Sequence, residues 1–251
     1  MDNIEEVYLA NFLWEEPINY KEIILNPVYC KDIHIFYASL YALLYDPLRH
    51  NSMISTLPRL YFLTDILNHQ EDIEYLKNNM FLYQMFAQLQ TILKLVLKDQ
   101  KFQFVKNKNR WFLRVKTSSG KVVDIKAKDF DVIREIILHQ NGIDYDDTFI
   151  HEDIRKWIAE QEAADKSSTV TIEDYIDAFM SQMDSYKLKD VREVSLRRFN
   201  RIVEKNLSRE NYDIQMTASM SGFATFKDKI NHWIAVNKKN SMYEKYFKEV
   251  K

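Results

Sequence analysis

The chain of 251 residues is long enough for one large domain or two small ones, and 46% hydrophobic and 14% aromatic residues suffice for a real core. This composition excludes a chain that is disordered over most of its length. The formal net charge is only −2, so any strong charge must be local.

Several protein classes are not expected from the termini, the apolar stretches and the cysteine count. The longest apolar stretches, such as 35–45 and 89–97, are interrupted by polar residues or fall short of the roughly 20 residues that cross a bilayer, so no membrane span is expected. The acidic N-terminus is unlike a secretory signal. Cys30 is the single cysteine, which excludes an intramolecular disulfide and a Cys-rich zinc site. A reducing cytoplasm fits best.

Charge is distributed in blocks along the chain. Residues 1–46 carry eight acids and two bases, residues 94–128 two acids and eleven bases, and residues 129–165 eleven acids and three bases. Complementary faces that pack within the protein or against a second copy would explain this pattern, so a homo-oligomer is one expectation. A surface for nucleic acid or an acidic partner on the basic block is the alternative.

The N-terminal part is predicted to be helical. There are only three glycines, and all four prolines fall at or before position 58, which favours helices over a strand-rich sandwich. The prolines predict short helices joined by turns, and the dense apolar residues of 33–45 predict a buried helix. The clearest helix signal covers residues 78–98, where apolar residues recur at steps of three and four and predict core packing. These residues are Leu82, Met85, Phe86, Leu89, Ile92, Leu93 and Val96.

Three extended segments then predict a β-meander. They cover residues 102–105, 110–116 and 121–126, and turn-forming residues separate them. In the second segment one alternate set is apolar and the other partly basic, so one face should dock on helices while the basic face stays in water. The two sets are Trp111, Leu113 and Val115, and Phe112, Arg114 and Lys116.

The rest of the chain is predicted to be helical as well. Asp129 is expected to cap a helix that buries Phe130, Ile133, Ile136 and Ile137 and ends at Asn141-Gly142. Further helices are expected over 153–164, 171–183, 195–207 and 212–220. Residues 171–174 resemble a capping box. The polar stretch 165–169 is the candidate hinge.

These elements together predict a mainly α protein with a small antiparallel β-meander, an α+β fold. Residues 1–100 form an N-terminal helical region, residues 101–165 the β-meander plus helices, and residues 166–251 a C-terminal helical region.

Common catalytic and cofactor motifs are missing from the sequence. No glycine-rich phosphate loop, H-E-x-x-H or G-x-S-x-G pattern is present, so neither a catalytic residue nor a cofactor is assigned. Cys30 and His34 have a spacing that could place two metal ligands on one helix face, but a buried cysteine and a partnered histidine are the commoner outcome. The acidic stretch 144–152 lacks the glycine and spacing of an EF-hand loop, so no metal site is predicted.

The main enzymatic alternative is the sequence Asp124-Ile-Lys126 on the last strand. A strand-borne acid-x-lysine can hold magnesium and position a water in restriction-type nucleases, with Asp99 as the upstream acid. Alternating charges on the wet face of a strand are the simpler reading.

Nucleic-acid binding by the basic meander is a further alternative. Cations interleaved with an aromatic ring could grip phosphates and stack bases, although no recognised binding motif is present. The candidate residues are Lys106, Lys108, Arg110, Trp111, Arg114 and Lys116.

The second half of the chain resembles bacteriophage proteins of tail and baseplate morphogenesis, especially tail assembly chaperones of phages that infect low-GC Gram-positive bacteria. The segments that carry this resemblance are 127–137 with Gln140-Asn141, 171–176, 195–203, 212–222, Phe226-Lys227 and His232-Trp233.

The resemblance implies a small helical protein that binds a tail component, such as the tape-measure protein or a baseplate part, without catalysis. It would act in the cytoplasm of the bacterial host, and incorporation into the virion is left open. A nucleic-acid-binding or nuclease-like protein, or a phage-encoded inhibitor of a host defence protein, are the alternatives.

Overall fold

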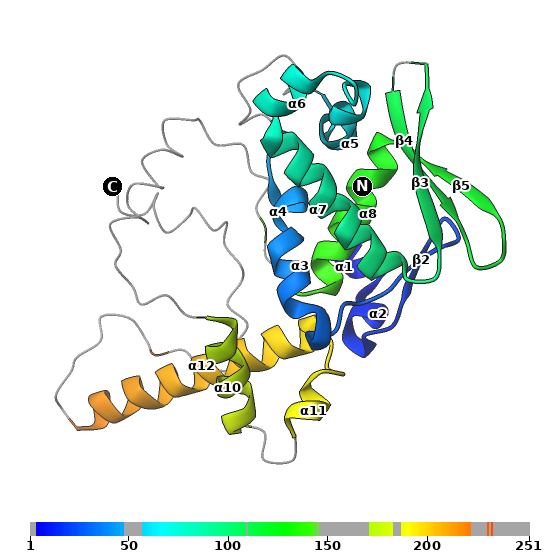
Figure 1. The fold of residues 1–251 in the computed structure, drawn as a ribbon. Helices are drawn as coiled ribbons and strands as arrows, with labels where there is room; N and C mark the ends of the chain where they lie inside the picture. The colour runs from blue at the N-terminus through cyan, green and yellow to red at the C-terminus, as the bar shows by residue number, and fades with distance from the viewer. Residues whose placement is uncertain are drawn as a thin grey trace, which may run out of the picture. The chain divides into compact units, whose positions relative to one another are not determined.

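The computed structural model describes residues 4–47, 57–108, 110–143, 145, 171–182, 187–221, 230 and 232. The chain divides into two compact units. The first comprises residues 1–145 and 195–197, and the second residues 146–194 and 198–251; Figure 1 labels the helices and strands. The predicted helix over 153–164, the hinge at 165–169 and most of the acidic stretch 144–152 lie outside the described residues. The sequence-based division at residues 100 and 165 stays a prediction.

The first unit combines helices with two small antiparallel sheets, which confirms the predicted α+β class. Its helices are α1 (Ile4–Val7), α2 (Leu9–Trp14), α3 (Ile33–Ser39), α4 (Tyr41–Leu44), α5 (Arg59–Thr64), α6 (Ile73–Asn78), α7 (Met80–Leu97) and α8 (Ala127–Gln140), with 3-10 turns η1 (Cys30–Asp32) and η4 (Asp65–Asn68). The strands are β1 (Ile18–Tyr20), β2 (Ile23–Leu25), β3 (Lys101–Asn107), β4 (Arg110–Lys116) and β5 (Val122–Ile125).

Helix α7 is the central core element of the first unit. All seven apolar residues of its predicted stripe are buried, together with Leu97. Among the described helices, α7 is long and apolar enough to cross a membrane. The same length and composition are typical of the core helix of a globular protein, and α7 is buried as such a helix here. The predicted buried helix over 33–45 is instead two helices, α3 and α4, which meet at Leu40.

Strands β1 and β2 form a hairpin where the sequence predicted short helices and turns. Its two-residue turn consists of Lys21 and Glu22, which have φ angles of 50° and 69°. Such turns usually contain Asn-Gly, so the sequence gives little local signal for this one. The turn is held by distant partners: Lys21 donates to Asp129 at 2.6 Å, and Glu22 pairs with Lys121.

The predicted β-meander is confirmed, with strand order β3-β4-β5. The register places Phe104, Leu113 and Ile125 side by side, and Phe104 contacts Phe86 of α7 with ring centroids 5.0 Å apart. In Figure 1 the sheet stands at one side of the first unit, with α7 and α8 on one of its faces. We call this the inner face, and the opposite one the outer face.

Helix α8 confirms the predicted core residues but corrects the predicted cap. Its N-cap is Lys126, and Asp129 lies inside the first turn, where it accepts hydrogen bonds from Lys21 and Tyr20. Asp129 therefore anchors the β1–β2 turn; it is not the N-cap residue, but its carboxylate also accepts a hydrogen bond from the backbone N–H of Lys126 at the start of the helix. At the other end, Asn141 is fully buried: its Oδ1 accepts from the backbone N–H of Val28 at 2.9 Å.

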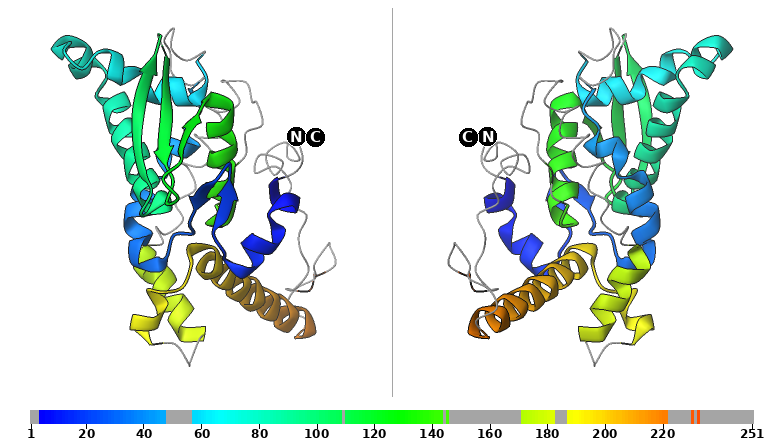
Figure 2. Two further views of the ribbon diagram at one scale, coloured as in Figure 1. Left: turned by 90° about the vertical axis from the view of Figure 1, so that its right-hand side faces the viewer. Right: turned by 90° about the vertical axis from the view of Figure 1, so that its left-hand side faces the viewer.

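The second unit contains α10 (Ile172–Gln182), α11 (Leu188–Val191) and most of α12 (Leu196–Met220). The predicted capping box at the start of α10 is confirmed, since Thr171 and Asp174 exchange hydrogen bonds of 2.7 and 3.2 Å. The two helices predicted over 195–207 and 212–220 are one continuous helix, drawn in yellow to orange in Figure 2. No proline or glycine interrupts residues 208–211, so the helix has no reason to end there.

Candidate functional site

The outer face of the β3–β5 sheet carries Arg114 and Lys116 of the predicted basic residues, together with Lys101. Strand alternation puts Lys101, Gln103 and Val105 of β3 on this face, and the register sets them opposite Lys116, Arg114 and Phe112 of β4. All six of these side chains are exposed or half-buried. The outer face is therefore accessible, basic and partly aromatic.

The centre of the outer face is an ion pair between two strands. Arg114 donates from Nε and Nη2 to the two carboxylate oxygens of Asp124, at 2.7 and 2.9 Å. The same guanidinium lies over the ring of Phe112, 5.5 Å from its centroid. Hydrogen bonding with Arg114 holds the pKa of Asp124 below its usual value and raises the pKa of Arg114. The pair fixes the orientation of the guanidinium plane.

The end of the sheet near the β3–β4 turn is tied to the helices by a polar cluster. Trp111 donates from Nε1 to Asn68 at 2.9 Å, and Asn68 donates to Asp65 at 3.2 Å. Asp65 also accepts from the hydroxyl of Tyr75 at 2.7 Å, and burial followed by this hydrogen bond raises the pKa of Tyr75. His69 stacks on Tyr75, with ring centroids 3.7 Å apart. The cluster positions Trp111 and the start of α6.

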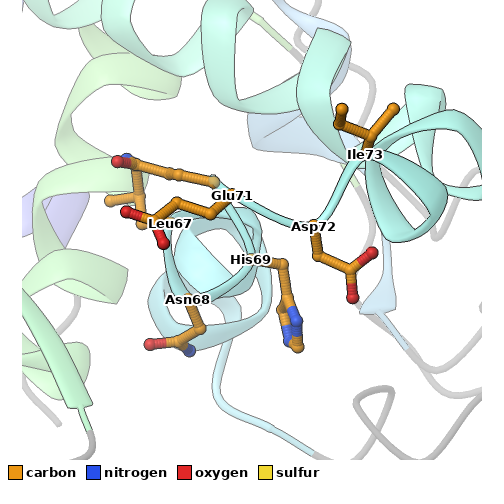
Figure 3. A pocket seen from close by; sticks show the side chains of 7 residues that line it. Leu67, Asn68, His69, Glu71, Asp72 and Ile73 are labelled. Carbon is orange, nitrogen blue, oxygen red and sulfur yellow. The ribbon is translucent and has the colours of Figure 1, made fainter.

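A pocket of about 800 Å³ opens beside this cluster, along the connection between η4 and α6 (Figure 3). Its lining includes His69, Glu71 and Asp72, and the side chains of His69 and Asp72 point to the same side. Asp72 accepts from the backbone N–H of Tyr75 at 2.9 Å and so caps α6. Of the polar groups in the pocket wall, Asn68, His69 and Asp72 thus have local structural roles.

The six residues predicted to bind nucleic acid do not share one face. Arg114 and Lys116 lie on the outer face, whereas Trp111, two residues from buried Leu113, lies on the inner face. The remaining three lie toward the β3–β4 turn: Lys106 lies 5.7 Å from the Trp111 ring centroid, Arg110 lies 5.3 Å from that of Tyr61, and Lys108 is in the turn with φ 55°. Sequence reasoning did not include Lys101, which the register places directly opposite Lys116.

The two acids of the nuclease alternative are not brought together. Asp124 is on β5, and Asp99 precedes β3 at the other edge of the sheet. Two strand spacings amount to about 10 Å, which is too far for both carboxylates to ligate one magnesium ion. Among the described residues, no group of three His, Cys, Asp or Glu side chains is arranged to hold a metal.

The spacing of Cys30 and His34 likewise does not produce a pair of ligands. Cys30 lies in η1 and is buried, while His34 lies in α3 and is exposed. Burial, with a smaller contribution from Glu15, raises the pKa of the Cys30 thiol to about 12. This cysteine is a core residue in its protonated form.

Helix α12 exposes an apolar stripe in the second unit. Phe199 and Val203 are buried, and Phe199 stacks on Phe179 with ring centroids 5.3 Å apart. At helical spacing the same face continues to Leu207 and Ile214, but these are 52% and 68% exposed. Tyr212, on the opposite side of the helix, contacts His232 with ring centroids 5.2 Å apart. We call Leu207 and Ile214 the exposed stripe.

The first unit exposes an apolar patch as well. The short helices α1 and α2 present Val7, Leu9, Leu13 and Trp14 to solvent, and Trp14 is 77% exposed. Clustered exposed apolar residues of this kind often mark binding surfaces.

Comparison with known proteins relates the second unit to phages. No curated protein and no solved structure matches the chain. Residues 162–238, which include all of α10, α11 and α12, match the family model described as the YomV second domain. This part of the chain is therefore similar to a phage-associated domain family.

Proposed function

We propose that this protein is a non-enzymatic phage morphogenesis protein that binds a tail or baseplate component during assembly in the host cytoplasm. The observation that carries the proposal is the exposed stripe of α12, within the part of the chain that is similar to a phage-associated domain. The apolar face of α12 is buried at Phe199 and Val203 but exposed at the exposed stripe. This is expected of a helix whose remaining apolar face packs against a partner protein.

The shape of this surface favours a helical segment of the partner. Leu207 and Ile214 are seven residues apart, the repeat by which two helices pack side by side. Next to Ile214 lies a depression of about 470 Å³ that is also lined by Thr217, Ala218 and Ser221. Small side chains at these positions let an apolar anchor of a partner helix approach closely. Tail proteins with long helices, such as the tape-measure protein, present such segments.

Affinity capture from phage-infected cells tests the proposal. Wild-type protein should retain a tail or baseplate protein, identified by mass spectrometry, and the double variant Leu207→Asp/Ile214→Asp should lose it because two charges would enter the apolar contact. Ser219→Asp is the matched control, since this exposed residue lies off the stripe on the same helix. Equal capture by the wild type and the double variant would contradict the proposal.

Two further outcomes would replace the proposed function with one of its alternatives. Stripe-dependent capture of a host defence protein would favour the inhibitor. Magnesium-dependent cleavage of DNA by the purified protein, abolished by Asp124→Ala, would overturn the non-enzymatic part.

A further inference from the structure

We propose that the outer face of the β3–β5 sheet is a second binding surface, one that takes single-stranded nucleic acid. A base would stack on the platform of Phe112 and Arg114, and phosphates would lie along Lys101 and Lys116. This proposal is independent of the exposed stripe of α12.

The stacking platform follows from the geometry of the Arg114 side chain. Asp124 holds the edge of the guanidinium through two hydrogen bonds, and the guanidinium carbon lies over the Phe112 ring, 5.5 Å from its centroid. The Arg114 side chain is nevertheless 36% exposed. Nucleobases stack on aromatic rings and on guanidinium planes without requiring a particular base, and open sheets with such platforms are a known architecture for binding single strands.

The charge beside the platform favours an anionic ligand. Lys101 and Lys116 are directly opposite in the strand register, and like charges in that position destabilise a sheet. Both side chains are exposed, and no carboxylate of the described residues lies within ion-pair distance of either ammonium. The acid on this part of the face, Asp124, is already paired with Arg114. A phosphate between the two lysines would offset their repulsion.

The spacing along β4 suits an extended strand. From Phe112 to Lys116 the strand rises by about 13 Å, which accommodates at least two nucleotides between the stacked base and the lysine pair. An acidic protein segment would satisfy the lysines but would leave the Phe112 ring and the Arg114 guanidinium without a planar partner. For this reason single-stranded nucleic acid is favoured over an acidic polypeptide.

Fluorescence anisotropy with a labelled oligothymidylate of about 20 nucleotides tests the proposal with the full-length protein. The wild type should bind with an affinity that falls steeply as salt rises. Lys101→Gln/Lys116→Gln should weaken binding by about tenfold at low salt, because two phosphate contacts are lost. Phe112→Ala should weaken it by about five- to tenfold through the loss of one stacked base.

The matched control is Lys77→Gln/Lys94→Gln, which removes the same charge from exposed positions of α6 and α7. This variant should bind as the wild type does. Circular dichroism checks that each variant is folded, and the lysine double variant, altered at exposed positions alone, tests the proposal even if Phe112→Ala unfolds the protein. Equal weakening by both lysine pairs would overturn it, and so would equally effective competition by polyglutamate.

Discussion

Helices α7 and α12 are both long and both carry an apolar stripe, but they use it differently. In α7 the stripe is covered along its whole length by the first unit, from Leu82 to Leu97. In α12 the stripe is covered at Phe199 and Val203 and then exposed at Leu207 and Ile214. The same sequence pattern therefore serves a core in one helix and an open surface in the other. The difference predicts that substitutions in α7 change stability and substitutions late in α12 change binding.

The largest expected effect is in α7. Leu89→Ala removes a fully buried side chain and should lower the free energy of unfolding by about 2–5 kcal/mol, since a cavity is left in the core. Urea unfolding followed by circular dichroism measures it. A cost as small as that of a surface substitution would mean that α7 is not the core helix, and the comparison with α12 would fail.

Loss of a buried polar contact in the first unit should lower the free energy of unfolding nearly as much. Asn141→Ala removes the acceptor for the backbone N–H of Val28 and the donor to the backbone oxygen of Ile137. This substitution should lower the free energy of unfolding by about 1–3 kcal/mol. Asn141→Asp is the informative second variant, because it keeps the acceptor and loses the donor. The same unfolding measurement applies, and an unchanged midpoint for Asn141→Ala would show that the contact is dispensable.

A smaller effect is expected from Asp129 and should depend on pH. Burial acts to raise the pKa of Asp129, but the hydrogen bond and charge of Lys21, with hydrogen bonds from Tyr20 and the backbone of Lys126, outweigh it and hold the pKa below its usual value. Because the folded-state pKa is the lower one, the ionised carboxylate stabilises the fold above about pH 4, and this contribution is lost as pH falls through the folded-state value.

Asp129→Asn should therefore lower the free energy of unfolding by less than about 1 kcal/mol at neutral pH, since Lys21 is half exposed. Unfolding at about pH 7 and about pH 3 measures the difference, which should shrink at the acidic value. A difference that grows on acidification would contradict the sign of the pKa shift.

The smallest expected effect on stability is in the exposed stripe. Ile214→Ala should change the free energy of unfolding by no more than about 0.5 kcal/mol, because the side chain is 68% exposed. The same variant should weaken capture of the phage partner. A stability loss comparable to that of Leu89→Ala would show that the protein covers this face itself, and the contrast between the two helices would disappear.

Several features could be predicted because their cause is local in the sequence. The stripe of α7 follows from apolar residues at steps of three and four. The capping box of Thr171 and Asp174 spans three residues, and the meander follows from alternation between turn-forming segments. The apolar residues of α12 recur at helical spacing as well, but this spacing could not show which of them are covered.

Other features depended on residues far apart in the chain. The β1–β2 hairpin has a Lys-Glu turn with little local signal, and its turn residue Lys21 is held by Asp129, which sequence reasoning took for a helix cap. In the candidate nucleic-acid surface, composition identified the basic residues, but strand register alone decided that Arg114 pairs with Asp124 and that Lys101 faces Lys116. Local patterns determine which elements form, because their energies come from neighbours in sequence. Tertiary packing decides which faces stay open, because burial and ion pairing depend on which distant segments come into contact.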